Sequence, residues 1–255
     1  MNIIVLVKQT FDTEEKIAIQ DGKVVEEGVS FVVNPYDEYA IEEAVKIKET
    51  LGADVTVLSI GPARVENAIR TALAMGADQA VLIEEEELPG DEQVLAKVLA
   101  AAIRNRPFDL ILAGNTSVDN GAGQVALRLA EELNIPHVST AVKLSVESGK
   151  AVVARDVEGN LEVIEAPLPL LVTAQQGLNE PRYPSLPGVM KAKKKPLERV
   201  KIADLGLSPE DLTPRVDIVD QYLRPERKAG KILSGDLAAQ TKELVQLLHN
   251  EAKVV

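Results

Sequence analysis

Two kinds of hydrophobic pattern alternate along the first half of the chain. Short apolar runs such as Ile3–Lys8 show no alternation of apolar and polar residues, which is typical of strands buried on both faces. Longer stretches such as Tyr36–Leu51 repeat apolar residues with a helical period. The other predicted strands are Ala53–Gly61, Gln79–Glu84 and Phe108–Asn115, and the other predicted helices are Ala63–Met75, Glu92–Ile103 and Gly123–Leu133. This order predicts the α/β class, with a mostly parallel, doubly wound sheet and helices on both faces.

The stretch between the first predicted strand and the first predicted helix differs from the other connections. Residues 8–34 show no helical period, and Asp21-Gly22 is typical of a tight hairpin turn. Asn34 is expected to cap the helix that follows, with Pro35 in its first turn.

The character of the chain changes at Gly177. Before it, four further segments have strand-like patterns: 137–146, 150–157, 160–167 and 168–175. After it, prolines recur, and only Ser234–Ala252 has a convincing helical period. So long a stretch with little regular structure is uncommon inside a compact domain. We therefore expect an α/β domain at residues 1–176 and an extended C-terminal arm at residues 177–255 that packs on another protein.

Composition excludes several classes of protein. The 255 residues carry a formal net charge of −12, which argues against general nucleic-acid binding, and the absence of cysteine excludes disulfides and thiolate catalysis. The chain shows no secretory leader and no apolar run near the roughly 20 residues of a membrane span, so we expect a soluble, cytoplasmic protein. No nucleophile with a base, no paired acids and no metal-binding cluster emerges, so we predict neither catalytic residues nor a metal site.

A polar loop with two glycines follows the predicted strand Phe108–Asn115. Ligands of α/β proteins bind at this edge of the sheet. Gly121 and Gly123 allow the backbone to approach a ligand closely, and the amides at a helix start favour a phosphate. A loop that only caps the helix has the same composition, so both interpretations stay open. The loop also offers the polar side chains of Asn115, Thr116, Asp119, Asn120 and Gln124.

The common nucleotide-binding signatures are missing. Neither G-x-G-x-x-G after the first strand nor a P-loop motif occurs. The Gly61-Pro62 turn either borders an adenine or ribose or simply starts a helix. The residues by themselves thus predict a nucleotide-binding domain with an extended arm. They do not predict which reaction, if any, the protein carries out.

Several blocks of the chain resemble the beta subunit of electron transfer flavoproteins. The most specific block is LNEPRYPSLPGVMKAKKK at residues 178–195. VLVKQTFD, NPYDEYAIEEAVKIKE, IRTALAMGAD, DLILAGNTSVDNGAGQ and VARDVEGNLEVIEAPLPLLVT follow the family's blocks in the family's order. The resemblance covers the whole chain and implies a fold similar to that of the adenine-nucleotide alpha-hydrolases.

The resemblance implies a heterodimer with an alpha subunit that holds most of the FAD. This chain would form a wall of the flavin pocket, with Thr13 and Tyr36 near the flavin ring, and would bind its own AMP. The dimer would take electrons from acyl-CoA dehydrogenases of fatty acid beta-oxidation, and from related dehydrogenases, and pass them to a membrane quinone oxidoreductase. By position, AMP would be lined by Leu6, Val7, Asn34, Pro35, Tyr36, Asp37 and Ile60, with its phosphate on the turn formed by Gly114, Asn115, Thr116, Ser117, Val118, Asp119, Asn120, Gly121, Ala122, Gly123 and Gln124.

The proline-rich segment 182–196 matches the family's recognition loop, which docks into an apolar pocket of the dehydrogenase. Its prolines argue against a helix or strand interior. Leu186 falls at the anchor of this loop, and Pro184 and Pro187 restrict the backbone around it, so that less entropy is lost on docking. Lys191 and lysines 193–195 either meet an acidic partner face or hold the arm against an acidic surface of the dimer itself.

One departure from the family leaves an alternative open. The turn at residues 114–124 is shorter than in the members most similar to mitochondrial proteins. Its length is nearer that of electron-bifurcating, NADH-dependent relatives, which hold a second FAD in place of AMP. Those relatives tend to lack SLPGVMKAKKK, which favours AMP here. A third interpretation, a stand-alone nucleotide-binding protein or hydrolase, has no use for the proline-rich arm.

Overall fold

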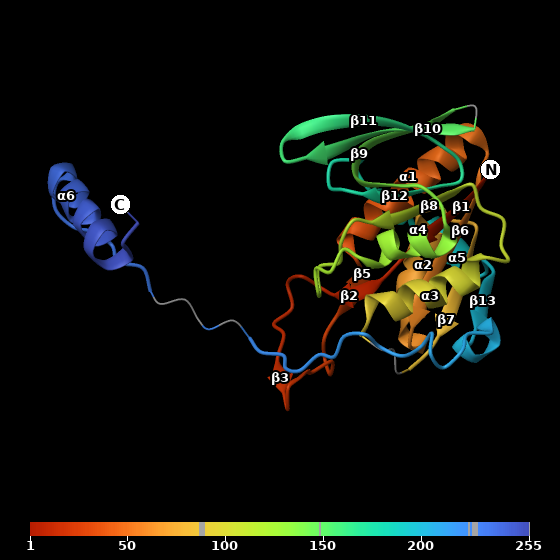
Figure 1. Cartoon of the computed structure of the whole chain (residues 1–255), viewed down its shortest axis with the longest axis horizontal. Coiled ribbons are helices and arrows are strands. Elements are labelled where there is room, and N and C mark those ends of the chain that lie inside the picture. Colours follow the sequence, from red (N-terminus) through yellow and green to blue (C-terminus); the bar gives the residue numbers. More distant parts are fainter. Residues whose placement is uncertain (87–89, 148, 224, 226–228, 255) are drawn as a thin grey trace. The chain divides into compact units, whose positions relative to one another are not determined.

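The computed structural model, which describes residues 1–86, 90–147, 149–223, 225 and 229–254, is built around one large sheet (Figure 1). Its nine strands follow the order β11-β10-β9-β12-β8-β1-β6-β7-β13. The seven strands β9-β12-β8-β1-β6-β7-β13 pair in parallel, each with its neighbour in this order. Strand β10 pairs antiparallel with β9 and β11. The strands are β1 (Asn2–Leu6), β6 (Asp54–Gly61), β7 (Gln79–Glu84), β8 (Leu110–Gly114), β9 (His137–Glu147), β10 (Lys150–Val157), β11 (Asn160–Pro167), β12 (Leu170–Ala174) and β13 (Leu197–Val200).

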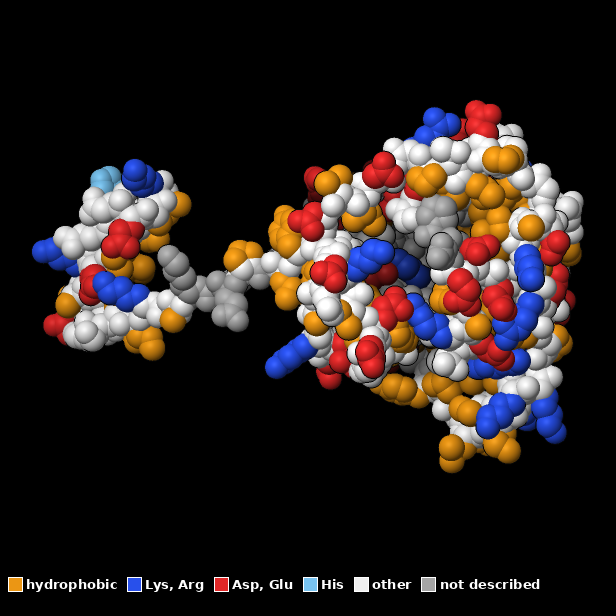
Figure 2. All heavy atoms as spheres, turned by 90° about the horizontal axis from the view of Figure 1, so that it is seen from below, with side chains coloured by type: hydrophobic (Ala, Val, Ile, Leu, Met, Phe, Trp, Pro, Cys, Tyr) orange, Lys and Arg blue, Asp and Glu red, His pale blue; other side chains and the backbone are white. Residues whose placement is uncertain are grey.

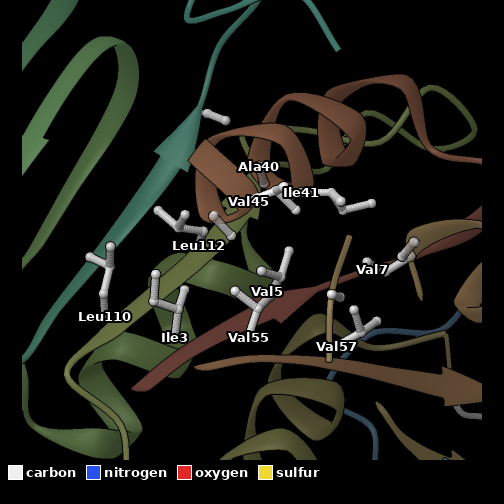
Figure 3. Packing of buried hydrophobic residues seen from close by; sticks show 14 of the residues in the cluster. Ile3, Val5, Val7, Ala40, Ile41, Val45, Val55, Val57, Leu110 and Leu112 are labelled. Carbon is white, nitrogen blue, oxygen red and sulfur yellow. The ribbon is translucent and has the colours of Figure 1, made fainter. Parts of the chain in front are cut away.

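Helices cover both faces of the sheet. Helices α1 (Pro35–Leu51) and α2 (Glu66–Met75), the latter preceded by the short η1 (Ala63–Val65), pack on one face. Helices α3 (Glu92–Ile103) and α4 (Val125–Leu133) pack on the other. Because the central strands are buried on both sides, they are apolar at nearly every position. Figure 3 shows Val5 and Val55 of neighbouring strands beneath Val45 of α1. The predicted fold class is confirmed.

The connection from β1 to α1 is an excursion without a helix. It contains the ribbon of β2 (Gln9–Phe11) and β5 (Phe31–Val33) and the small hairpin of β3 (Ile19–Gln20) and β4 (Lys23–Val24). Asp21 and Gly22 have φ values of 52° and 72°, as the predicted tight turn requires. The guanidinium of Arg64 lies 3.8 Å from the centre of the Phe31 ring and thereby ties the ribbon to the region before α2.

Part of the expected C-terminal arm belongs to the α/β domain. The segment after Gly177 forms α5 (Leu186–Ala192), β13 and the short η2 (Ile202–Leu205). Strand β13 pairs in parallel with β7, while Ala192 and Ile202 are buried in the two cores. The compact units are therefore Met1–Asp220 and Gln221–Val255, which differs from the expected boundary at residue 176. The open hydrogen-bonding edge of β7 explains the difference, because it gives the backbone of β13 its partners.

The second unit contains helix α6 (Leu237–Leu247), which continues into a π-helical turn, η3 (Leu248–Ala252). This agrees with the helix predicted at Ser234–Ala252. No residue of α6 is buried, and its hydrophobic side chains lie on its surface (Figure 2).

The visible face of the first unit has a surface of mixed charge. Acidic and basic side chains are interspersed on the face of the first unit that Figure 2 presents. Within the described ranges, none of the helices combines the length and the hydropathy that crossing a bilayer requires.

Candidate functional site

The candidate site lies at the carboxyl edge of the sheet, where β1 and β8 are neighbours. The chain leaves β1 toward α1 on one face, and it leaves β8 toward α4 on the opposite face. Open α/β sheets bind their ligands at the edge where neighbouring parallel strands diverge in this way, and this edge is hereafter called the crevice. The loop Gly114–Gln124, hereafter the β8–α4 loop, follows β8 at this point.

Asp37 joins three of the segments that meet at this edge: the end of β1, the end of β8 and the start of α1. One carboxylate oxygen accepts the backbone N–H of Lys8 after β1, at 2.7 Å. The other accepts the backbone N–H of Gly114 at 3.1 Å and the side-chain amide of Asn34 at 2.9 Å. The side chain is buried, with only 6% of its residue surface exposed. Asp37, which the family resemblance places at AMP, therefore holds the crevice together, and its own oxygens are already occupied.

Burial raises the pKa of Asp37 from 3.8 to about 7, and the hydrogen bonds from Lys8, Asn34 and Gly114 oppose this shift only in part. Between about pH 4 and pH 7 the folded protein retains a proton that the unfolded chain has released. The free energy of unfolding should therefore fall as pH rises through this window, by about 2–4 kcal/mol in total. Unfolding of the wild type and of Asp37→Asn, measured at pH 5 and pH 7.5, checks this expectation. The fall should be absent from Asp37→Asn, and an equal fall in both proteins would contradict it.

Asn34 occupies the N-cap position of α1, as predicted, but its side chain makes no capping hydrogen bond. Its side-chain oxygen accepts the backbone N–H of Val118 at 3.2 Å, and its amide donates to the carbonyl oxygen of Thr116 at 2.9 Å. The expectation of a side-chain cap is therefore corrected. The partners of this side chain are in the β8–α4 loop and in Asp37, so Asn34 anchors the loop to the start of α1.

The β8–α4 loop ends at a helix start whose amides have no side-chain cap. The side chain of Gln124, at the cap position, instead accepts hydrogen bonds from Arg128 at 2.7 and 3.1 Å. Gly121 and Gly123 have φ values of 66° and 60°, which favour glycine. Uncapped amides at a helix N-terminus attract an anion, so this end of the loop fits the predicted phosphate.

Lys8 is a member of this cluster that the residue-level analysis did not single out. Its ammonium group lies 2.7 Å from the carboxylate of Asp119 and 3.2 Å from the hydroxyl of Ser117. This contact lowers the pKa of Asp119 against the opposing effect of burial. By pairing with Asp119, Lys8 offsets a negative charge that would otherwise repel a phosphate. The signal for Lys8 was its place at the end of the first predicted strand.

A residue of β12 fixes the side chain of Asn115. The hydroxyl of Thr173 donates to the side-chain oxygen of Asn115 at 3.0 Å and accepts the backbone N–H of Thr140 at 3.0 Å. Thr173 is buried, so the carbonyl end of the Asn115 amide is fixed. Sequence analysis missed Thr173 because it stands within an apolar strand pattern.

The other predicted site residues are only partly gathered at the crevice. Leu6 and Val7 are buried in opposite cores at the end of β1, and Pro35 begins α1. Tyr36 and Ile60 are partly exposed, in the first turn of α1 and near the end of β6. Thr13 is exposed on the excursion, and no described hydrogen bond joins it to the β8–α4 loop. The remaining loop residue of the predicted set, Ala122, donates its N–H to the side chain of Asn120 at 3.2 Å.

The second candidate region is the segment at residues 182–196. It contains the short helix α5, which corrects the expectation that its prolines exclude a helix. Pro187 stands in the first turn, where its missing N–H costs no hydrogen bond, and the Ser185 hydroxyl accepts the N–H of Gly188. Leu186 is 84% exposed. Its exposure agrees with the anchor role that the resemblance implies.

Lys195 differs from the other lysines of this segment. Its ammonium group donates to the carbonyl oxygens of Leu73 and Ala77 at the end of α2. Burial lowers its pKa. Lys195 therefore serves the fold, whereas Lys191, Lys193 and Lys194 are exposed.

Among the described residues, no group of three or more His, Asp or Glu side chains is arranged to hold a metal ion.

These features define a doubly wound α/β protein with a polar loop at its switch point. The profile of the family "Electron transfer flavoprotein domain" matches residues 21–205. The chain is 54% identical over 257 residues to "Electron transfer flavoprotein subunit beta" of Bacillus subtilis (strain 168), with 100% of both chains covered. It is 39% identical over 253 residues to the human protein of that name, and the aligned region covers 96% of this chain and 98% of the relative. The chain belongs to the electron transfer flavoprotein family, as a beta subunit, and the resemblance found in its motifs is confirmed.

Proposed function

We propose that this chain pairs with an alpha subunit to share one FAD, and that it binds a structural AMP at the carboxyl edge of β1 and β8. The dimer, in the cytoplasm, takes electrons from acyl-CoA and related dehydrogenases and passes them to a quinone oxidoreductase. Full-length similarity to electron transfer flavoprotein beta subunits supports the electron-carrier role.

The observation that carries the AMP proposal is the uncapped start of α4 at the end of the anchored β8–α4 loop. Asn34 and Asp37 hold the loop against the start of α1, so its backbone is fixed by contacts within this chain. Lys8 offsets the carboxylate of Asp119. Amides at a helix start suit an anionic group, and the phosphate of AMP is such a group.

The residues available to the FAD are few. Tyr36 is partly exposed in the first turn of α1, and Thr13 is exposed on the excursion after β2. Both fit a wall that shields one part of a flavin, while the flavin itself, when bound, supplies the electron-accepting chemistry. This chain then has to orient the cofactor and exclude water.

The second compact unit suits the alpha subunit as its partner. Helix α6 places Leu237, Leu244 and Val245 on its surface and buries no residue of its own. A short helix gains most of its stability from packing an apolar face against another element. The alpha subunit, which shares the cofactor with this chain, is the partner that we expect to cover this helix.

Release of the ligands from the purified heterodimer tests the cofactor proposal. Denaturation followed by chromatography should yield one FAD and one AMP per dimer, because the β8–α4 loop offers a phosphate site separate from the shared flavin. Two FAD and no AMP would instead support the bifurcating alternative. A dimer that releases only FAD, in a single copy, would contradict a nucleotide at this loop.

A further inference from the structure

The segment that contains Leu186 is attached at its upstream end to α1 through an arginine. The guanidinium of Arg182 binds the carboxylate of Glu42 at 2.8 and 3.0 Å and the carboxylate of Glu49 at 2.6 and 3.0 Å. The backbone N–H of Arg182 also donates to Glu42, at 3.1 Å. Just upstream, the Asn179 amide donates to the Tyr39 carbonyl oxygen at 3.0 Å. Planar, bidentate arginine–carboxylate pairs fix direction as well as distance.

A second arginine attaches the downstream end to α2. Arg70 donates to the carbonyl oxygens of Ala192 and Lys195, at 2.8 and 2.9 Å. Its own side chain is held by Glu66, at 3.0 Å. Between the two attachments the segment lies close to α2, because a Cβ at Gly188 would stand 2.7 Å from the carbonyl oxygen of Ala74. The segment is therefore fixed at both ends and against the helix beneath it.

Core packing does not explain this attachment. Ala192 is the one residue of α5 that is buried. The large apolar side chains point outward instead: Tyr183 is 95% exposed, and Leu186, Val189 and Met190 are also exposed. A segment that buries so little gains little stability from its own contacts. Its two arginine attachments hold it in one place while they leave the apolar side chains uncovered.

We propose that Arg182 and Arg70 are positioning residues for partner recognition, which fix both ends of the segment so that Leu186 is presented in a preformed geometry. This rests on the proposed function, in which Leu186 docks into a dehydrogenase. A preformed segment loses less conformational freedom on docking. The two arginines thus act on the encounter with the partner.

The experiment compares heterodimers with Arg182→Gln, Arg182→Lys and Glu49→Gln, and with Leu186→Ala. Arg106→Gln is the matched control, because it removes a bidentate pair with Glu198 of β13, at 2.8 and 2.8 Å, which lies outside residues 183–191. Amide hydrogen exchange over residues 183–191 reports the order of the segment. Stopped-flow reduction by an acyl-CoA dehydrogenase, over a range of dehydrogenase concentrations, separates kcat/KM from the limiting rate. Flavin content and thermal unfolding report the state of the fold.

Arg182→Gln should speed exchange of residues 183–191 and lower kcat/KM roughly 3- to 10-fold, with the limiting rate and flavin content unchanged, since it removes preorganisation of a few side chains. Arg182→Lys and Glu49→Gln should give smaller changes in the same direction, and Arg106→Gln none. If Arg182→Gln reduces as fast as Arg106→Gln while Leu186→Ala is slow, the positioning role is overturned and the docking role stands. If Leu186→Ala is itself as fast as wild type, the docking role fails, and the positioning role fails with it.

Discussion

Leu186→Ala is expected to slow reduction of the heterodimer's flavin by an acyl-CoA dehydrogenase and to leave the flavin content intact. Leu186 is 84% exposed in this chain, so its side chain contributes little to the fold. Burying one leucine in a partner's pocket contributes about 1.5–3 kcal/mol, which corresponds to roughly 10- to 150-fold in affinity. The loss should appear in kcat/KM, measured by stopped flow at dehydrogenase concentrations below saturation.

The local structure favours a clean test of this variant. Leu186 stands at the start of α5, and alanine is a good helix former, so the helix and its Ser185 cap should persist. Leu51→Ala is a suitable control, because Leu51 is another exposed leucine, at the end of α1. Equal rates for the two variants would refute the anchor role.

The hydrophobic pattern predicted the α/β domain well, because each element shows its own periodicity. Strand β7 and helix α3 occupy the predicted ranges, and the Asp21-Gly22 turn has the predicted backbone. Strand β13 could not be predicted from its own residues. It is short and partly polar, and it is a strand because β7 offers it a free edge. Tertiary context decided that element, and with it the domain boundary.

Tertiary context also decides the roles of the residues in the candidate site. The glycines of the β8–α4 loop and the start of α1 were predicted as parts of one site from motifs and resemblance. Their roles depend on hydrogen bonds between residues far apart in sequence, such as that from Gly114 to Asp37. No local pattern shows that the Asn34 side chain binds a loop more than 80 residues away instead of capping its own helix. Sequence analysis found the residues at this edge, and only the structure shows which of them are hydrogen-bonded to one another.

Helix α1 connects the two candidate regions. Its first turn contains Asp37, which holds the ends of β1 and β8. Further along, Glu42 and Glu49 hold Arg182 and with it the segment of Leu186. The proposed nucleotide site and the proposed docking surface are thus placed relative to each other by one well-packed helix. A change that shifts the start of α1 should affect the crevice first.

Gly114→Ala makes that change. A Cβ at residue 114 would stand 2.2 Å from the Asp37 carboxylate and 2.8 Å from the backbone of Tyr36, so either α1 or β8 must move. The clash also disturbs the hydrogen bond from Gly114 to a buried carboxylate. We expect a loss of about 2–4 kcal/mol in the free energy of unfolding, hence a fall of roughly 5–15 °C in Tm. The heterodimer should also retain less AMP, measured by ligand release after gel filtration.

Gly121→Ala separates the clash from the general cost of replacing a glycine in the same loop. Gly121 has a φ of 66°, but a Cβ there would meet nothing within 4 Å. Its replacement should cost about 1 kcal/mol of backbone strain and leave Asp37 in place. If Gly114→Ala were no more destabilising than Gly121→Ala and retained AMP equally well, the close contact between β8 and the start of α1 would not be what holds the crevice. Asp37 would then not be the group that joins β1, β8 and α1, because that role requires residue 114 to have no side chain.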